Sequence, residues 1–197
     1  MNTLCQLASA PARFIRGFIS ILMAVAVSAC ATVEVPQVQF YTLQSQASGE
    51  EPPQGSVEVA NAGLRIERVS MAAYLSQPGI VITDSDGKIY SANYHQWAEL
   101  PKIAIKRRLE RCVLTNAGQG DGRQLIRLNV DKFQGDEKGN AVFGGVWTMI
   151  PQGARSASET YLFEYREKQI GDGYVPLVAA LSVTVQKLCE EIRSFSG

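Results

Sequence analysis

The stretch Gly173–Ser194, GYVPLVAALSVTVQKLCEEIRS, decides the fold class of this chain. Its apolar residues recur at intervals of three and four, a spacing that puts them on one face of an α-helix. Such a helix gains most of its stability by packing this face on another element. The apolar stripe comprises Val178, Leu181, Val185, Leu188 and Ile192. The rest of the chain must therefore supply a surface, most simply a sheet, for this helix to cover.

Segments in which apolar and polar residues alternate precede this helix, and they predict β-strands. The clearest is Gln124–Gln134, where Ile126, Leu128 and Val130 alternate with polar residues. Asp84–Gly87 (DSDG) is typical of a hairpin turn, because Asp and Gly tolerate positive φ. Alternation with one apolar face is the pattern of antiparallel strands that cover a core. The expected strands are residues 37–43, 56–71, 79–83, 88–91, 124–134, 141–150 and 159–166.

A second helix is expected over Leu100–Ala117, between two groups of strands. Pro101 suits the first helical turn, because backbone N–H groups there have no hydrogen-bond partner within the helix and proline has no N–H. Gly118 is expected to end the helix. The apolar positions of this helix are Ile105, Leu109, Cys112 and Val113. The order strands, helix, strands, helix predicts an α+β fold. We expect a single domain with a mostly antiparallel sheet and two main helices packed on one face.

The N-terminus carries the marks of export. Arg13 and Arg16 precede an apolar run, Phe18–Val27, which is too short to span a membrane as a helix of about 20 residues. The next residues complete Val27–Cys30 (VSAC), which resembles the lipobox of bacterial lipoproteins, whose cysteine thiol takes a diacylglycerol. We expect a lipoprotein signal peptide at residues 1–29, lipidation at Cys30 and a tether over 30–36. The alternative is an ordinary signal peptide or an uncleaved anchor.

The residue after the cysteine indicates which membrane holds the lipid. Ala31 stands where an aspartate would be the usual signal for retention in the inner membrane. We therefore expect the outer membrane, periplasmic face. Stable anchoring needs several acyl chains, and the tri-acylated form expected of such lipoproteins has them. The folded domain is then residues 37–197, and the lipid is its expected membrane attachment.

Two cysteines remain after export, because Cys5 leaves with the signal peptide and Cys30 carries lipid. Cys112 and Cys189 fall on the apolar sides of the two expected helices. In an oxidising compartment they form either a disulfide or two buried, unbonded thiols, and the sequence leaves both readings open.

No group of residues indicates catalysis, a cofactor or a metal. His95, the one histidine, has no serine or cysteine in a nucleophile context, and with two cysteines it shows no metal-ligand spacing. Gly118–Gly122 (GQGDG) lacks the Lys-Ser/Thr ending of a phosphate loop. We therefore expect no catalytic, cofactor-binding or metal-binding residues, and no enzyme.

The helix over 100–117 is basic on the side opposite its apolar stripe. This side is either a partner surface for an acidic protein or anionic lipid, or a solvated face with no partner. Its residues are Lys102, Lys106, Arg107, Arg108 and Arg111. The mature chain has no basic excess, since removal of 1–29 leaves 17 Lys and Arg against 19 Asp and Glu. No nucleic-acid partner is expected.

Several motifs occur in an order that resembles one known family. Phe40–Leu43 (FYTL) soon after a lipobox is similar to the opening of the ABC-type transport auxiliary lipoproteins, the PqiC type. Tyr94–Pro101 (YHQWAELP) resembles that family's tryptophan-centred start of the first helix, and Gly173–Ala180 (GYVPLVAA) its start of the last helix. Ala73 departs from the pattern, where proline is more usual. The resemblance covers essentially the whole mature chain.

The resemblance implies a role in lipid transport. Members of the family are outer-membrane partners of MCE-type systems, in which a protein bridge carries lipid across the periplasm. The implied partners are an MCE-domain protein with its permease and ATPase, and the protein docks the outer end of the bridge without enzymatic activity. Formation of a homo-oligomer stays open. The alternative is a lipoprotein that assembles or regulates another envelope complex, such as a cell-wall synthase or secretion machine.

Overall fold

The longest alternating segments form the centre of one sheet. The computed structural model describes residues 36–43, 63–114, 124–151 and 158–195. In these residues β5 (Gln124–Asp136) and β6 (Asn140–Pro151) pair antiparallel, and β7 (Glu159–Lys168) pairs antiparallel with β6. Burial follows the predicted alternation, because Ile126 and Leu128 are buried while the neighbouring Arg127 is exposed. The prediction of these three strands is confirmed.

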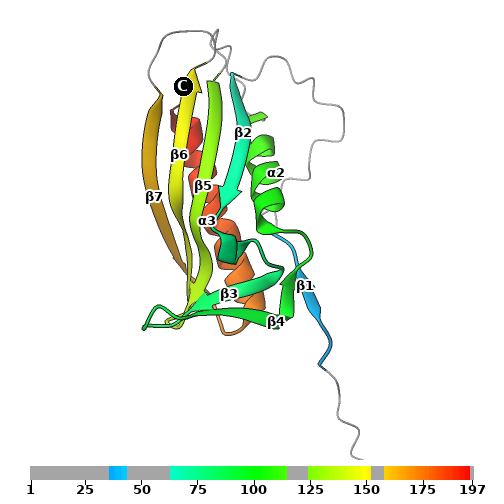
Figure 1. The fold of residues 1–197 in the computed structure, drawn as a ribbon. Coiled ribbons are helices and arrows are strands. Elements are labelled where there is room, and N and C mark those ends of the chain that lie inside the picture. The colour runs from blue at the N-terminus through cyan, green and yellow to red at the C-terminus, as the bar shows by residue number, and fades with distance from the viewer. Residues whose placement is uncertain (1–35, 44–62, 115–123, 152–157, 196–197) are drawn as a thin grey trace, which may run out of the picture. The chain divides into compact units, whose positions relative to one another are not determined.

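The remaining strands complete a seven-stranded sheet within the described residues (Figure 1). They are β1 (Gln39–Tyr41), β2 (Leu64–Met71), β3 (Gly79–Thr83) and β4 (Ile89–Trp97). The strand order is β1-β4-β3-β5-β6-β7, and β2 also pairs with β5. β2 and β3 share one edge of β5, since β2 pairs along residues 124–130 and β3 pairs at Gly135 and Asp136.

The expectation of a mostly antiparallel sheet is wrong, because the sheet is mixed. β1 with β4, β2 with β5 and β3 with β5 are parallel pairs, and the other three pairings are antiparallel. The parallel partners are separated in sequence by other elements, and the connection from β2 to β5 includes helix α2 (Pro101–Leu114). A connection of this length allows a strand to return in the same direction. Alternation reports which face is buried and not the direction of the neighbouring strand.

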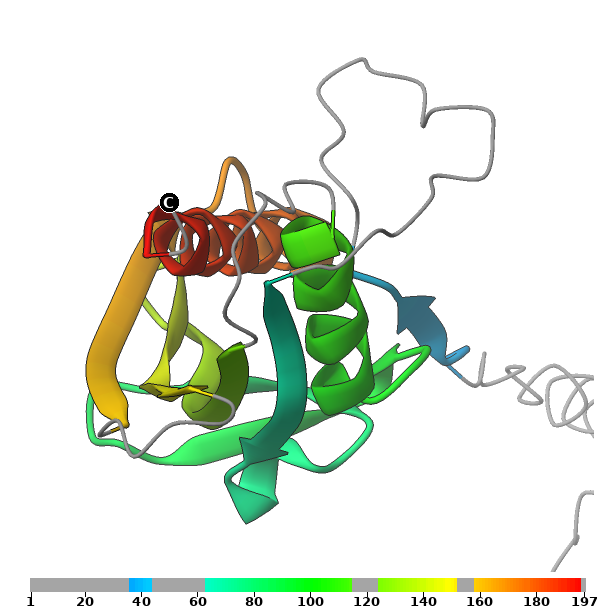
Figure 2. The ribbon, with the colours of Figure 1, turned by 90° about the horizontal axis from the view of Figure 1, so that it is seen from above.

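Two α-helices lie on the same face of the sheet (Figures 1 and 2). Helix α3 (Tyr174–Ser194) packs on β5, β6 and β7, and α2 packs on β2. The predicted stripe of α3 is buried, with Leu181, Val185, Leu188 and Ile192 fully inaccessible. The helices also contact each other. The predicted α+β class and the placement of both helices on one face are thus confirmed, and the described residues from Gln37 onward belong to one compact unit.

The segment Tyr94–Trp97 is strand rather than the start of a helix. Trp97 is the last residue of β4, lies opposite Tyr41 of β1, and donates its backbone N–H to the carbonyl oxygen of Pro78 at 2.7 Å. Helix α2 begins only at Pro101. Trp97 is buried against Phe133, with ring centroids 5.7 Å apart. The expected strand ends at residue 91 because polar residues, Asn93, His95 and Gln96, are frequent in the rest of β4.

The close packing of β5 against β6 depends on a glycine. A side chain at Gly145 would place its Cβ 2.1 Å from the carbonyl oxygen of Asn129, so only glycine fits there. The register of the two strands shifts between Val130 and Lys132, directly beside this contact. The resulting irregularity increases local strand twist, which helps the sheet to curve around α3.

Candidate functional site

Helices α2 and α3 are joined by a disulfide between Cys112 and Cys189, whose Cα atoms lie 6.2 Å apart. This separation is within the range that disulfides adopt. Cys189 is buried in the core and Cys112 is half-buried at its border. Of the two readings that the sequence left open, the structure adopts the disulfide. The bond fixes the spacing of the two helices at this level.

The five basic residues expected to share one face of α2 fall into two groups. Lys102 is exposed, and Lys106 lies 3.6 Å from Glu110 one turn along the helix. The second group, Arg107, Arg108 and Arg111, lies toward α3 and lines a cavity between the helices. Helical spacing explains the division, because positions three and four apart share a side of the helix. The two lysines therefore do not line the cavity, although Arg107 and Arg111 are exposed as well.

The cavity between α2 and α3 has a volume of about 260 Å³. From α2 it is lined by Ala104, Arg107, Arg108, Arg111 and Cys112, and from α3 by Gln186, Cys189 and Arg193, with Leu43 beside them. The lining positions are three or four residues apart along each helix. Arg193 is the fourth arginine of the site, and the sequence analysis missed it because its helix is far away in the sequence.

The guanidinium groups of this arginine cavity differ in their surroundings. Arg107 donates two hydrogen bonds to the carboxylate of Glu99, at 2.7 and 2.5 Å. Arg108 is half-buried, and burial lowers the pKa of its guanidinium. Arg111 is exposed at the rim. Among the described residues no Asp or Glu lines the cavity. The cavity therefore gathers four arginines beside the disulfide.

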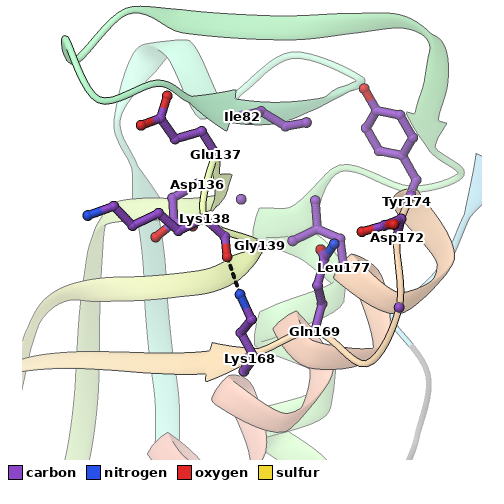
Figure 3. A pocket seen from close by; sticks show the side chains of 13 residues that line it. Ile82, Asp136, Glu137, Lys138, Gly139, Lys168, Gln169, Asp172, Tyr174 and Leu177 are labelled. Carbon is purple, nitrogen blue, oxygen red and sulfur yellow. Dashed lines mark hydrogen bonds between the residues drawn. The ribbon is translucent and has the colours of Figure 1, made fainter.

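A second cavity, of about 530 Å³, lies where the β5–β6 turn meets the start of α3 (Figure 3). Its lining includes Asp136, Lys168, Asp172 and Tyr174 over an apolar floor that contains Leu177. Gly173 is the N-cap residue before the helix, and its φ of 96° favours glycine, which explains the Gly-Tyr pair at this point of the sequence. This cavity holds acidic and basic groups side by side.

The polar groups of the second cavity hold the local structure together. Asp136 accepts hydrogen bonds from the backbone and side chain of Asn140, both at 2.8 Å. Burial raises the pKa of this carboxyl, but these hydrogen bonds and the nearby Arg166 outweigh burial and hold the pKa below its ordinary value. Lys168 donates to the carbonyl oxygen of Lys138 (Figure 3). Asp136 and Lys168 therefore stabilise the β5–β6 turn. The arginine cavity is the better candidate site.

His95 joins β4 to the start of α3. Its ring stacks on Tyr174 with centroids 4.0 Å apart, and its Nδ1 lies 2.8 Å from the hydroxyl of Tyr41. The histidine thus links three elements by aromatic contact and one hydrogen bond.

The expected lipidation residue Cys30 and the expected signal peptide lie outside the described residues. Within those residues no helix has the length and apolar character needed to cross a membrane. The described side chains also contain no group of three or more His, Cys, Asp or Glu arranged to hold a metal ion.

Comparisons with known proteins agree on one family. The sequence model of the family described as "ABC-type transport auxiliary lipoprotein component" matches residues 41–193. The "Intermembrane transport lipoprotein PqiC" of Escherichia coli (strain K12) is 26% identical over 161 residues, which cover 78% of this chain and 82% of that protein. The protein of the same name from Shigella flexneri has the same identity and coverage.

Two solved structures share the fold. One, described as an uncharacterized protein, superposes with a TM-score of 0.64 at 20% identity, covering 82% of this chain and 99% of that one. A protein from Xanthomonas campestris superposes with a TM-score of 0.57 at 15% identity, covering 78% of this chain and 92% of that one. These similarities support the architecture alone.

Proposed function

Because the chain belongs to the ABC-type transport auxiliary lipoprotein family, we propose that it docks the outer end of an MCE-type lipid transport bridge. The family match over residues 41–193 carries this proposal. The curated relatives are intermembrane transport lipoproteins, and their similarity extends over most of both chains. Since the family consists of transport auxiliaries and not of enzymes, we propose a role without chemistry of its own.

The proposed anchor is lipid on Cys30, exposed by removal of residues 1–29 and inserted in the periplasmic face of the outer membrane. The tether over 30–36 has seven residues, which span at most about 25 Å when fully extended. The domain begins with β1, which is held by parallel pairing with β4 and by the hydrogen bond from Ala98 to the carbonyl oxygen of Tyr41 at 2.8 Å. A domain on so short a tether stays near the membrane, so the bridge must reach it there.

The side of α2 that carries Lys102 and Lys106 is the proposed docking surface for the MCE-domain protein, whose permease and ATPase drive transport. Lys102 is exposed, and Lys106 forms only a half-exposed ion pair with Glu110. Exposed charges of this kind contribute little to folding. They can nevertheless steer an acidic partner and determine specificity.

Cross-linking in cells tests the proposal. The lipidated chain is captured after mild cross-linking, and the co-purified proteins are identified by mass spectrometry. We expect an MCE-domain protein, and we expect Lys102→Glu with Lys106→Glu to reduce its recovery. The single variant Lys102→Glu is compared with Lys138→Glu as the matched control, because Lys138 is also exposed but lies on the β5–β6 turn away from α2. Recovery of a cell-wall synthase in place of the MCE-domain protein would contradict the transport role. Equal recovery of the MCE-domain protein with both variants would show that the docking surface is not on this side of α2.

A further inference from the structure

The two edges of the sheet differ in charge. The strand order ends at β7 on one side and at β1 on the other (Figure 1). Five of the ten residues of β7 are charged, which is a common protection of an exposed edge against pairing with another chain. By contrast, residues 36–43 and β4 contain no Asp, Glu, Lys or Arg. The edge that β1 and β4 form, called the β1–β4 edge below, lacks this protection, so a cover of another kind is expected there.

Large apolar side chains project into solvent from the β1–β4 edge. The exposed fractions of Val38, Phe40 and Tyr94 are 40%, 65% and 44%. On the side that the helices cover, the hydroxyl of Tyr41 lies 2.8 Å from Nδ1 of His95. Phe40 precedes Tyr41 and Tyr94 precedes His95, so both face the opposite side, because successive side chains of a strand alternate. Val38, two positions before Phe40, shares this side. The three side chains therefore form one uncovered apolar patch.

The position of this patch in the chain indicates what covers it. The proposed tether ends at residue 36, directly before the β1 segment, and its seven residues span at most about 25 Å. Val38 and Phe40 are therefore the apolar side chains of the domain that follow the proposed lipid anchor most closely in the chain. A bilayer disfavours charged side chains, and this edge has none to bury. Phe suits the apolar side of a membrane surface, and Tyr is enriched at the boundary between membrane and water.

We propose that the β1–β4 edge rests on the membrane, with Val38, Phe40 and Tyr94 inserted between the headgroups and the acyl chains. The proposal rests on the proposed lipid at Cys30 and not on the identity of the transport partner. Lipid on one residue limits the distance of the domain from the membrane but does not set its orientation. A second contact through an edge strand fixes which side of the domain faces the periplasm.

Fluorescence quenching on the lipidated full-length protein tests the proposal. The protein is reconstituted in vesicles of phosphatidylethanolamine and phosphatidylglycerol that also contain phosphatidylcholine, either plain or brominated in the upper part of its acyl chains. Bromine quenches a tryptophan only at close contact. Phe40→Trp and Tyr94→Trp each place a reporter in the patch, and the native Trp97 and Trp147 are buried, so their emission in the unchanged protein is subtracted. Flotation of the vesicles shows that the protein is attached.

Leu162→Trp is the matched control, because Leu162 is 83% exposed and lies on β7, at the other edge of the sheet. Insertion to a depth of about 5–10 Å reaches the acyl chains, so brominated lipid should lower the added emission about twofold or more for the two patch variants. The emission of Leu162→Trp should not change. Circular dichroism checks that all three variants are folded.

Three results would overturn the membrane contact. Attached protein without quenching at Phe40→Trp, or with equal quenching at Leu162→Trp, would refute the contact and leave the lipid anchor intact. A shift of the added emission to shorter wavelength without quenching would show that protein, either a second copy or a partner, covers the edge instead. Failure to float would refute the lipid anchor and the contact together. Recovery of the MCE-domain protein after cross-linking tests the transport role separately.

Discussion

Loss of the Cys112–Cys189 disulfide should remove a large part of the stability of the domain. The two residues are 77 positions apart, so the bond closes a long loop in the unfolded chain. On the chain-entropy model, a loop of this length corresponds to roughly 4.5 kcal/mol at 25 °C. The free energy of unfolding of such domains is about 5–15 kcal/mol, so loss of the bond should remove roughly a third or more of it.

Urea unfolding measures the effect in three samples. Oxidised protein, reduced protein and a Cys112→Ala, Cys189→Ala double variant are compared, and reductant added to the double variant is the control. We expect reduction to lower the free energy of unfolding by about 4 kcal/mol, and the melting temperature by roughly 10–15 °C. The free energy of unfolding of the double variant should be slightly lower than that of the reduced protein, because Cys189 is buried and its sulfur packs in the core. A loss below about 1 kcal/mol in reduced protein would refute the reasoning from loop closure.

Three further changes test the core, the acid response and the anchor. Leu181→Ala should lower the free energy of unfolding by ~2–5 kcal/mol, because Leu181 is fully buried. Lys187→Ala should lower it by under about 1 kcal/mol, because the ion pair of Lys187 with Glu167 is half-exposed. Similar melting temperatures for the two variants would contradict the packing of α3. The pKa of Asp136 is lowered in the folded protein, so this carboxylate stabilises the fold at neutral pH and the contribution is lost as the pH falls through the pKa. The Asp136→Asn variant should therefore be less stable than the unchanged protein at pH 7, and its stability should fall less between pH 7 and pH 3. Urea unfolding at these two pH values measures both effects. Cys30→Ser should abolish firm membrane attachment, and a cleaved variant that still fractionates with the outer membrane would exclude lipid on Cys30.

The sequence predicts individual elements well and their arrangement less well. The stripe of α3 and the alternation of β5 are periodic patterns, and periodicity directly reports which side of an element is buried. Strand direction is set by the partner, and β2 pairs with a strand about 60 positions later, beyond the reach of any local pattern. The same limit explains why the strand expected over 88–91 does not extend to Trp97, since the β-structure of Trp97 depends on β1 and on Pro78.

The arginine cavity shows the same division between local and distant information. The charges of α2 are evident in the sequence, but which of them line the cavity, the three arginines and not the two lysines, depends on where α3 lies. Arg193 is 82 positions after Arg111 and carries no local sign of sharing a site with it. The composition of the helix therefore predicted a basic surface, and only the packing of two helices makes it a cavity.

The disulfide was the one sequence feature that could have located this cavity. A bond between Cys112 and Cys189 requires α2 and α3 to meet side by side at those two residues. Residues one turn away from a bonded cysteine then lie beside the junction, because side chains three or four positions apart share a helix face. Among described residues this rule selects Arg108 and Leu109 on α2, and Val185, Gln186, Ile192 and Arg193 on α3. The three polar residues of this set line the cavity, and the three apolar ones are buried in the core. A disulfide between two helices thus predicts which polar residues lie beside the junction, provided that the pairing of the cysteines is known.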